Sequence, residues 1–468
     1  MFSVGVKISG LDDFIAPSQD CIKPAVVENR IVTGAKRGTI KVESDGTYKE
    51  LSSNGDEVLL QKAKITLNDC LACSGCVTTA ETMLIEQQSY SQILESLKTR
   101  KTGSVFAATV SPQSVASLAA FYSDDFISTA ERISFYLKSI GVDYVFDSNI
   151  GRNLTLLESG KEFVERFRGK SEHFPVFTSS CPGWICYAEK THGDFILPFI
   201  SKVKSPQQMM GSLIKRQLAS SLKVDADLVY HFTVMPCFDK KLEALRSDFV
   251  VPGTEIKEVD CVVATNELFL MMAESSQSFT TFEKKPFDSL VDLLEGRLNR
   301  EYTFRSHEGS GAGGYIEHVF KYAADQLFGV KNPPLDFVVK RSTDHKELFL
   351  NIDGEIKLRF AVAYGFKNLG NFAMKLKKNN LKYDYVEIMA CPSGCLNGGG
   401  QLRSEAANNK ELLNEVTARY WSLPTMEPSF DVDLSNEKSE CADDVNSFFF
   451  AEYKSVPKMN TNSLNIKW

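Results

Sequence analysis

The loop that decides the fold reads Met389-Ala390-Cys391-Pro392-Ser393-Gly394-Cys395-Leu396-Asn397-Gly398-Gly399-Gly400-Gln401. Its glycines permit positive φ angles and allow the backbone to approach a bulky group closely. The preceding residues 384–388 have a strand pattern, so the loop follows the end of a strand, where α/β sheets build their sites. Two thiolates on such a loop favour a soft metal or an iron–sulfur cluster, and a cysteine pair beside an ordinary turn is the alternative.

The composition is that of a globular protein. The chain has 468 residues, enough for two or three domains, with 43% hydrophobic residues, 24% charged residues and a net charge of −7. We expect no nucleic-acid partner, which would need a basic face, and no membrane span, because no apolar run reaches ~18 residues. Residues 1–16 fit neither a secretory signal nor an Arg-rich transit peptide, which predicts the cytosol or the nucleus. In those compartments the eleven cysteines are expected to include metal ligands rather than disulfides.

A second cysteine pattern lies near the N-terminus. Cys70, Cys73 and Cys76 have the spacing that opens the bacterial ferredoxin run and can wrap three corners of one cubane. A ferredoxin has Cys-Pro four residues after the third cysteine, whereas this chain has Ala80 there. The fourth ligand must come from elsewhere, and Cys21 is the only other cysteine in the first 180 residues. Zinc is the alternative occupant, although zinc sites usually pair two C-x2-C hooks.

From residue 89 onwards, short apolar segments alternate with helical ones. We expect strands at 104–110, 143–147, 176–177, 227–234, 258–264, 348–351, 358–363 and 384–388. We expect helices at 90–100, 115–122, 129–140, 160–167, 239–246, 266–273 and 369–378. This alternation predicts an α/β fold with parallel sheet structure.

Three cysteine loops each follow a predicted strand. One loop carries Cys181, one carries Cys237, and one carries both Cys391 and Cys395. The carboxyl ends of parallel strands share one edge of a sheet, so we expect the four thiols to converge at that edge. Four thiolates are the number that one 4Fe–4S cluster requires.

The remaining cysteines and a second glycine-rich stretch have other expected roles. Cys261 lies within a strand pattern and is expected to be a core hydrophobe, while Cys186 and Cys441 match no ligand pattern. Residues 309–314 precede a helix but lack the Gly-Lys-Ser/Thr of a nucleotide-binding loop. We therefore expect this stretch to be a helix N-terminus packed beside the cluster.

The cysteine loops resemble the active-site signatures of iron-only hydrogenases. Residues 178–184 are similar to T-S-C-C-P-x-W, residues 235–243 match M-P-C-x-x-K-x-x-E, and residues 387–401 match E-x-M-A-C-x-x-G-C-x-x-G-G-G-Q. Residues 143–157 and 204–209 resemble further blocks of that family. This likeness covers residues 66 to 402 of the chain.

The opening of the chain resembles a narrower group. Residues 11–24, with their lone Cys21, are similar to the eukaryotic hydrogenase-like proteins of cytosolic iron–sulfur assembly, which are related to the nuclear prelamin A recognition factor. With this segment included, the resemblance extends over nearly the whole chain.

The resemblance implies an α/β fold of two lobes, each with a small parallel sheet flanked by helices, and a 4Fe–4S cluster buried between them. It implies a second 4Fe–4S cluster in a small ferredoxin-like N-terminal region. Residues 1–88 would form that region, 89–402 the two-lobed domain, and 403–468 a C-terminal extension with a docking tail. By the family motifs the inner ligands are Cys181, Cys237, Cys391 and Cys395, and the outer ligands are Cys21, Cys70, Cys73 and Cys76.

Some residues depart from the hydrogenase pattern. Hydrogenases have a cysteine before the first cluster ligand, placed to pass protons to a di-iron site, whereas this chain has Ser180, whose hydroxyl is a far weaker acid. Hydrogenases commonly have paired glutamates where this chain has Glu158-Ser159. Other residues still fit a di-iron pocket, or packing around a cubane alone: Pro206, Gln207, Lys240, Glu243 and Met389.

We therefore expect a non-catalytic protein that relays clusters, or bridges scaffold and targeting complexes, in the maturation of cytosolic and nuclear iron–sulfur proteins. A hydrogenase-type redox enzyme and a lamin-tail-binding structural protein are the alternatives. The last three residues resemble the targeting tripeptides of cytosolic iron–sulfur assembly, which have an aliphatic residue, then Asp, Glu or Ser, then Trp or Phe. Ile466 and Trp468 fit this pattern and Lys467 departs from it. We expect the tail to dock on the targeting complex through its WD40 subunit.

Overall fold

The computed structural model describes residues 39–42, 48–51, 57–60, 85, 88–297, 302–340, 342–403, 409–430 and 442–455. Three strands near the N-terminus, β1 (Thr39–Val42), β2 (Tyr48–Leu51) and β3 (Glu57–Leu60), form an antiparallel sheet. No helix in the described ranges is long and apolar enough to cross a membrane. Several residues named above lie outside the described residues: Cys21, Cys70, Cys73, Cys76, Cys441, Ile466 and Trp468.

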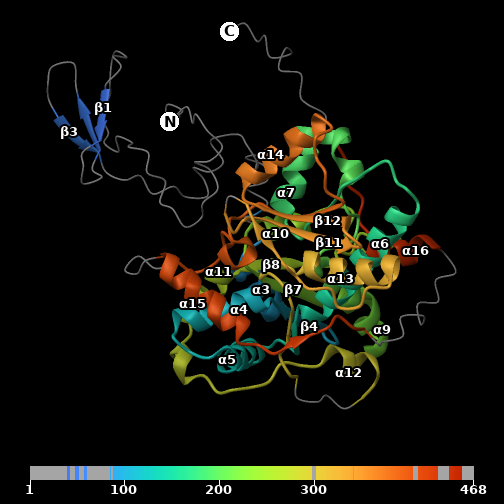
Figure 1. The fold of residues 1–468 in the computed structure, drawn as a ribbon. Coiled ribbons are helices and arrows are strands. Elements are labelled where there is room, and N and C mark those ends of the chain that lie inside the picture. Colours follow the sequence, from blue (N-terminus) through green and yellow to red (C-terminus); the bar gives the residue numbers. More distant parts are fainter. Residues whose placement is uncertain are drawn as a thin grey trace, which may run out of the picture.

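A four-stranded parallel sheet forms one lobe (Figure 1). Its strand order is β5 (Tyr144–Asp147), β4 (Val105–Val110), β7 (Val229–Met235) and β8 (Cys261–Ala264). All three strand pairs are parallel. The strands are almost wholly buried because helices cover both faces of the sheet.

Successive side chains of these strands enter two different cores, as the alternation of a strand requires. Ala108 packs with helices α3 (Tyr90–Lys98), α4 (Pro112–Phe121), α5 (Phe126–Ser139) and α11 (Thr265–Ala273). Ala107 packs on the opposite face, with α8 (Pro206–Ser212) and the π-helical turn Leu213–Leu218. The start of α5 is fixed by Asp125, whose carboxylate accepts a 2.8 Å hydrogen bond from the Ser128 N–H.

The second lobe contains a five-stranded mixed sheet, which lies above the first sheet in Figure 1. Its order is β10 (Val338–Val339), β11 (His345–Ile352), β12 (Glu355–Tyr364), β13 (Tyr385–Met389) and β6 (Val176–Thr178). The strands β12, β13 and β6 are parallel, as predicted.

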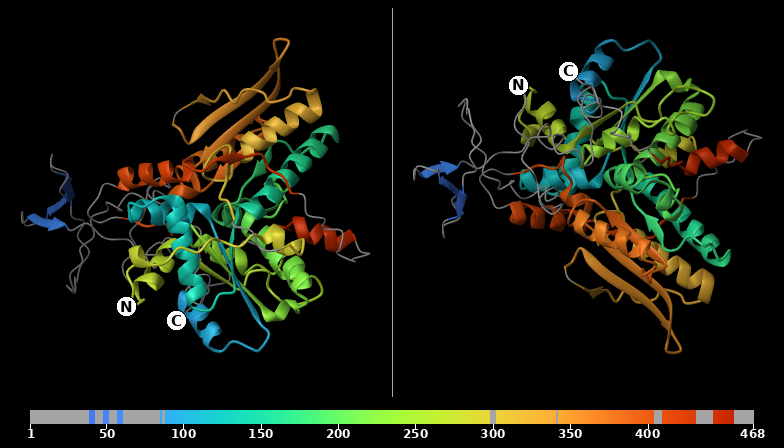
Figure 2. Two further views of the ribbon diagram at one scale, coloured as in Figure 1. Left: turned by 90° about the horizontal axis from the view of Figure 1, so that it is seen from below. Right: turned by 90° about the horizontal axis from the view of Figure 1, so that it is seen from above.

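Strand β11 runs antiparallel to both of its neighbours, β10 and β12. The second sheet is therefore mixed, whereas the sequence predicted a parallel one. The physical reason is a tight hairpin between β11 and β12. Asp353 and Gly354 both have positive φ angles, as a two-residue turn of this kind requires. Figure 2 shows this orange hairpin projecting from one end of the molecule.

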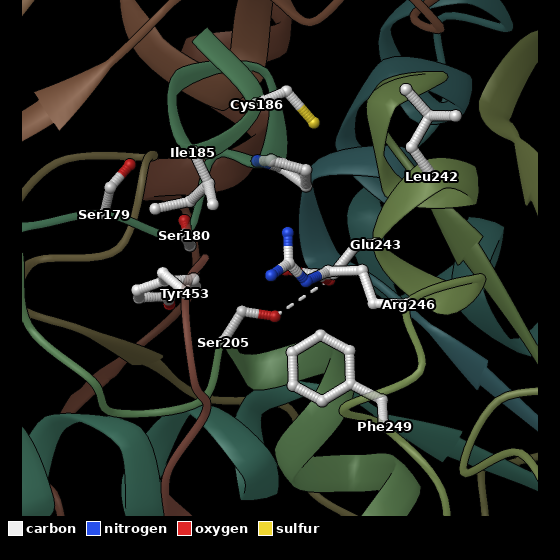
Figure 3. Close-up of a pocket in the computed structure, with 11 residues that line it drawn as sticks. Ser179, Ser180, Ile185, Cys186, Ser205, Leu242, Glu243, Arg246, Phe249 and Tyr453 are labelled. Atoms are coloured by element: carbon white, nitrogen blue, oxygen red, sulfur yellow. Dashed lines mark hydrogen bonds between the residues drawn. The ribbon is translucent and has the colours of Figure 1, made fainter. Parts of the chain in front are cut away.

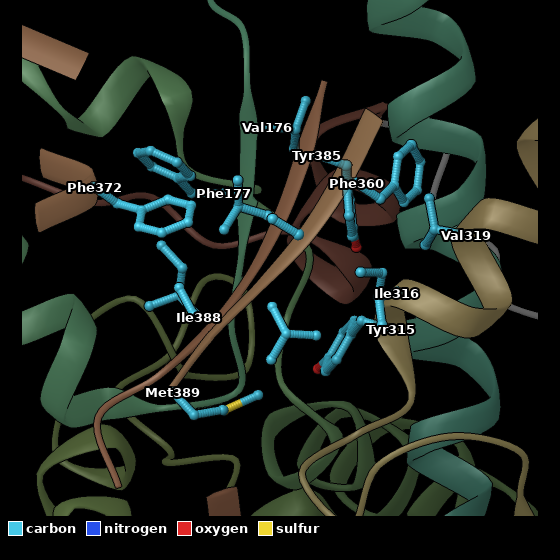
Figure 4. Close-up of a cluster of buried hydrophobic side chains, with 14 of the residues drawn as sticks. Val176, Phe177, Tyr315, Ile316, Val319, Phe360, Phe372, Tyr385, Ile388 and Met389 are labelled. Carbon is cyan, nitrogen blue, oxygen red and sulfur yellow. The ribbon is translucent and has the colours of Figure 1, made fainter. Parts of the chain in front are cut away.

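Aromatic packing holds helices against this second sheet (Figure 4). The Phe360 ring on β12 lies 4.9 Å from Tyr385 on β13, 5.1 Å from Phe163 on α6 (Asn149–Arg168) and 5.3 Å from Phe320 on α13 (Tyr315–Phe328). Helix α14 (Phe366–Lys377) adds Phe372 to the same core. Each fully buried ring of this size stabilises the fold by about 1.5–3 kcal/mol, so these contacts fix where the sheet lies relative to its helices.

Helix α6 is much longer than predicted. The sequence indicated residues 160–167, whereas the helix spans Asn149–Arg168. Its first half is buried on nearly all sides, so the apolar periodicity that marks a half-exposed helix is absent there. A Cβ on Gly151 would lie 2.5 Å from the Pro206 carbonyl oxygen, so glycine allows α6 to pack directly against the start of α8.

The described parts of the C-terminal extension join the same body. Helix α15 (Asn409–Trp421) packs on α4, and β14 (Thr425–Met426) pairs in parallel with β9 (Ser306–His307). Helix α16 (Ala442–Phe449) leads to Phe450, which bridges Val203. The domain boundaries stay predictions.

The remaining short elements are α7 (Pro182–Tyr187), α9 (Ala219–Leu222), α10 (Asp239–Ala244) and α12 (Leu290–Leu294), with a π-helical turn at Ala188–His192 and 3-10 turns at Gly193–Phe195, Leu197–Phe199, Ala226–Leu228, Phe279–Thr281 and Gly394–Asn397.

A buried ion pair joins α8 to the segment before β8. The Lys204 ammonium lies 2.7 Å and 2.8 Å from the two carboxylate oxygens of Glu258, and it donates a 2.9 Å hydrogen bond to the Ser212 hydroxyl. Both charged side chains are almost fully buried, with 1% and 0% of their surface exposed. Burial raises the pKa of Glu258, although Lys204 opposes the rise.

Replacing Lys204 by methionine should destabilise the protein, because it leaves the Glu258 carboxylate buried without its partner. We expect the free energy of unfolding to fall by about 3–5 kcal/mol, measured by denaturant titration. Lys161→Met is the matched control, since its pair with Glu158 is 53% exposed on the lysine side and should contribute about 0–1 kcal/mol. Equal unfolding midpoints for the two variants would contradict the assignment.

Candidate metal centre

The four predicted inner cysteines come from the strand ends of both sheets. Cys237 follows β7 of the parallel sheet, while Cys181 follows β6, and Cys391 and Cys395 follow β13 of the mixed sheet. The charges of the other three thiols each contribute to the raised pKa of Cys237, so the four groups lie near one another. The expectation of a single sheet edge is therefore wrong. The thiols converge where the carboxyl edges of two sheets face each other.

Direct hydrogen bonds tie the first and third loops together. The Ser179 hydroxyl donates to the Ile388 carbonyl at 2.5 Å and accepts from the Cys181 N–H at 3.0 Å. The backbone of Ala390 also hydrogen-bonds the Cys181 thiol. These bonds set the spacing between Cys181 and the loop that carries Cys391.

Glycines allow the second and third loops to meet backbone to backbone. The Gly400 N–H donates a 2.9 Å hydrogen bond to the Pro236 carbonyl, and the Gly400 carbonyl accepts one of 2.9 Å from the Asn266 N–H. A Cβ on Gly398 would lie only 2.3 Å from that Pro236 oxygen. No larger residue fits there unless the loop carrying Cys395 moves away from Cys237.

All four thiols have raised pKa values. Burial is the largest cause for each, and the nearby Asp239 carboxylate adds to the rise for three of them. The pKa of Cys395 rises to about 12. Cys181 is buried, and the other three cysteines are half-buried. Bare thiolates are therefore unfavourable here, and a bound cation would reverse this because it stabilises the deprotonated ligand.

The donor set fits an iron–sulfur cluster better than a single ion. The four cysteines are not in disulfides. In the parts of the chain that the structure covers, no three His, Cys, Asp or Glu side chains gather closely enough to hold one metal ion. Four sulfur donors that are close but separate suit a group with four iron corners, each bound by its own thiolate. Their role as ligands stays a prediction.

The glycine-rich stretch packs beside the cysteines, as predicted. It precedes α13, and its Ala312 carbonyl lies 3.3 Å from the Ser180 hydroxyl and 4.0 Å from the Cys395 sulfur. Glu387, on β13, accepts hydrogen bonds from the Ile316 N–H at 2.9 Å and the Tyr364 hydroxyl at 2.7 Å. A carboxylate thus caps the start of α13 and holds the stretch against the site.

A compact polar cluster stands where the hydrogenase-like pocket was expected. The Lys240 ammonium lies 2.8 Å from a Glu243 oxygen and 3.0 Å from the Ser205 hydroxyl. Gln207 donates to the same Glu243 oxygen at 2.9 Å. These groups satisfy one another, so the cluster is a closed hydrogen-bond network and does not present free ligands.

The cavity beside this network is small (Figure 3). Its volume is about 20 Å³, which is room for roughly one water molecule. The lining includes Ser180 from the first cysteine loop, Cys186 from α7, Arg246 from the segment after α10, and Tyr453 from the C-terminal extension. A second metal group would have to displace these side chains.

The structure places two of the cysteines that are not predicted ligands. Cys261 is fully buried in the core beneath α11, which confirms its expected role as a core residue. Cys186 is on α7 and borders the small cavity. The sequence reading missed Asp239, Arg246 and Tyr453. Asp239 follows Cys237 by two positions and could have been noticed, whereas Arg246 and Tyr453 reach the site only through the tertiary fold.

Comparison with known proteins agrees with this fold. Residues 104–399 match the family profile of the iron only hydrogenase large subunit, C-terminal domain. A variant of the FeFe-hydrogenase HydA1 from Chlamydomonas reinhardtii has a TM-score of 0.68 at 24% identity, over 78% of this chain and 99% of that chain. A second variant, in the apo form, has a TM-score of 0.67 at 25% identity over the same shares. This likeness shows the hydrogenase fold.

Two relatives match the chain from end to end. The cytosolic Fe-S cluster assembly factor narfl of Xenopus tropicalis is 45% identical over 480 residues, which span 100% of this chain and 99% of the relative. The chain belongs to the hydrogenase-like family of cytosolic iron–sulfur assembly factors. Cytosolic iron-sulfur assembly component 3 of Rattus norvegicus is also 45% identical, over 483 residues with the same shares. The family likeness thus includes the N-terminal and C-terminal parts that the hydrogenase profile leaves out.

The close approach at Gly398 can be tested in this assembly-factor chain. In Gly398→Ala the new Cβ meets the Pro236 carbonyl, so the Cys395 loop must shift away from Cys237. The two predicted 4Fe–4S clusters correspond to about eight iron atoms on the wild-type chain after anaerobic reconstitution, and we expect about four on the variant, because only the predicted inner cluster depends on this loop contact. Elemental analysis measures this. Gly399→Ala is the control, since nothing lies within 4 Å of its Cβ. Equal iron in the two variants would rule out the loop contact as a requirement.

Proposed function

We propose that this chain is a non-catalytic iron–sulfur protein of cytosolic iron–sulfur cluster assembly. The observation that carries the proposal is the 45% identity to cytosolic assembly factors over the full length of both chains. Similarity confined to the hydrogenase-like domain would leave the activity open, because one fold supports many functions. Similarity that includes both ends favours a shared role.

The site chemistry supports a role without hydrogen turnover. Ser180 stands where hydrogenases have a proton-passing cysteine, and its hydroxyl donates to the Ala312 carbonyl. A serine hydroxyl does not ionise near neutral pH, whereas a thiol has a pKa near 8.5. The adjoining cavity of about 20 Å³ has no room for a di-iron unit. The serine and the small cavity both support the proposed role without hydrogen chemistry.

We propose two resident 4Fe–4S clusters. The inner one would be bound by the thiols of Cys181, Cys237, Cys391 and Cys395, and the outer one by Cys21, Cys70, Cys73 and Cys76. Such clusters supply stored electrons, or iron and sulfide that can be passed on. The chain's own contribution is to hold the inner thiols between two packed lobes, away from water.

We further propose the cytosol as its site of action, with clients in both cytosol and nucleus. Its partners would be the scaffold that supplies clusters and the targeting complex, including a WD40 protein, that delivers them. The C-terminal Ile466 and Trp468 would form the contact with that complex, as an aromatic anchor next to a terminal carboxylate.

Complementation in eukaryotic cells depleted of their own relative tests the function. We expect the wild-type chain to restore radiolabelled iron in cytosolic iron–sulfur enzymes, and Cys395→Ala to fail, while mitochondrial iron–sulfur enzymes keep their iron in both cases. The purified, reconstituted protein should produce no hydrogen from reduced methyl viologen. Full rescue by Cys395→Ala, or measurable hydrogen, would overturn the proposal.

Deletion of Trp468 tests the docking tail separately. We expect the truncated chain to bind the targeting complex at least about tenfold more weakly, because a buried aromatic anchor commonly carries ~2 kcal/mol or more of an interface. Its iron content should not change, since Trp468 is not one of the proposed cluster ligands. Lys467→Glu, which restores the acidic middle position, should bind more tightly. Affinities measured by interferometry that are equal for truncated and full-length chains would remove the tail from the interface.

A further inference from the structure

The C-terminal extension returns to the body of the protein and runs beside residues 202–204, just before α8. The Lys204 N–H donates to the Phe449 carbonyl at 2.8 Å, and the Ala451 N–H donates to the Lys202 carbonyl at 2.7 Å. Phe450 forms an antiparallel bridge with Val203. Residues 448–455, called the closing segment below, are therefore held by backbone hydrogen bonds.

Side chains anchor the start of the closing segment. Phe448 is 2% exposed and packs in the core that contains α8. The Arg216 guanidinium lies 4.9 Å from its ring centre, and the Ser212 hydroxyl donates to its carbonyl at 3.2 Å. Ser212 also contacts the Lys204–Glu258 ion pair, so the segment is attached to one of the most deeply buried polar groups in the fold.

The second half of the closing segment reaches the small cavity (Figure 3). Tyr453 lines it together with Ser180 and Cys186, and its ring packs against the core of the mixed-sheet lobe. The Arg246 guanidinium lies 5.5 Å from the Tyr453 ring centre and donates to the Glu452 carbonyl at 3.2 Å.

Glu189 links Arg246 to the closing segment. Its carboxylate accepts two hydrogen bonds from Arg246, of 2.9 Å and 2.8 Å, and a third of 3.1 Å from the Lys454 N–H. One carboxylate thus fixes both the arginine beneath Tyr453 and the backbone after it. Charge-assisted, paired bonds of this kind are stronger and more directional than neutral ones.

We propose that the closing segment is a built-in cover over the cavity beside the inner cysteines, and that the Tyr453 ring is the part that keeps solutes out. Ser180 and Pro182 flank Cys181 and line the same cavity, so the cavity borders the loop that carries this proposed ligand. With the ring in place, the cavity admits roughly one water molecule. The proposal goes beyond the assembly role and does not depend on it.

Cys186 provides a probe of the cover that is independent of any cluster. It lines the cavity and is not a proposed ligand. The full chain, reconstituted with iron and sulfide, is treated with iodoacetamide, and alkylation of each cysteine is followed by peptide mass spectrometry. We expect Tyr453→Ala to raise the alkylation rate of Cys186 at least about tenfold, because removal of the ring lowers the free energy of local opening.

Two controls make the result specific. Tyr453→Phe keeps the ring and should alkylate Cys186 at the wild-type rate, since the cover depends on the ring and not on the hydroxyl. Cys261 is fully buried in the other lobe and should stay unmodified in every variant, which shows that the fold is intact. Loss of the inner iron to a chelator should accelerate in Tyr453→Ala alone.

The outcomes decide the proposal. Equal Cys186 rates in Tyr453→Ala and wild type, with Cys261 protected, would overturn it. A Tyr453→Phe rate as fast as that of Tyr453→Ala would overturn the role of the ring. If Tyr453→Ala also exposes Cys261, the smaller change Tyr453→Leu is measured, and a wild-type Cys186 rate with Cys261 protected would likewise refute the cover.

Discussion

The structure depends on a backbone contact between two separate sheets. Cys237 ends a strand of the parallel sheet, whereas Cys391 and Cys395 end a strand of the mixed sheet, so a four-sulfur site exists only if the two carboxyl edges meet. They meet at the Pro236 carbonyl, which accepts the Gly400 N–H at 2.9 Å and faces the bare Cα of Gly398. Any side chain at Gly398 would part the two loops. Glycine at 398 is therefore required for the two loops to pack together, and the two lobes meet at this contact.

Buried polar groups hold the glycine-rich stretch before α13 against the cysteine loops. The Arg152 guanidinium donates to the Gly313 carbonyl at 2.7 Å, and Glu387 caps the start of α13, so two buried charges clamp the stretch whose Ala312 carbonyl faces Ser180 and Cys395. A buried charge is tolerated only when partners surround it, and removing a partner is far more costly than removing the pair. The loops that carry sulfur are thus positioned by residues that never contact it.

The small cavity beside the cysteines is where this chain differs from the hydrogenases that share its fold. The chain shares its architecture with FeFe-hydrogenases, yet the space next to the cysteines is filled by a closed network of Lys240, Glu243, Ser205 and Gln207 and by Tyr453 from beyond the hydrogenase-like region. Side chains that satisfy one another leave no ligand free for a further metal group. The small cavity supports the proposed assembly role, which is carried by the full-length identity to assembly factors, and it is the space over which the proposed cover lies. A cluster enclosed by two lobes and a fixed segment is protected from water, and its exchange depends on local opening rather than on open access.

The sequence by itself determined most of the strands and helices, and it predicted which four thiols come together. Strand patterns placed β4, β7 and β13 close to their observed bounds, and cysteine spacing selected the four thiols that the fold brings together, because both signals are local. It could not give the long α6, whose first half is buried all round and lacks periodicity, or the β11–β12 hairpin that makes the second sheet mixed. Tertiary structure alone decided that the thiols meet between two sheets, and that Tyr453 lines the same cavity as Cys186. The reason is physical: these facts are distances between segments hundreds of residues apart, set by how whole lobes pack, and no local pattern in the chain encodes them.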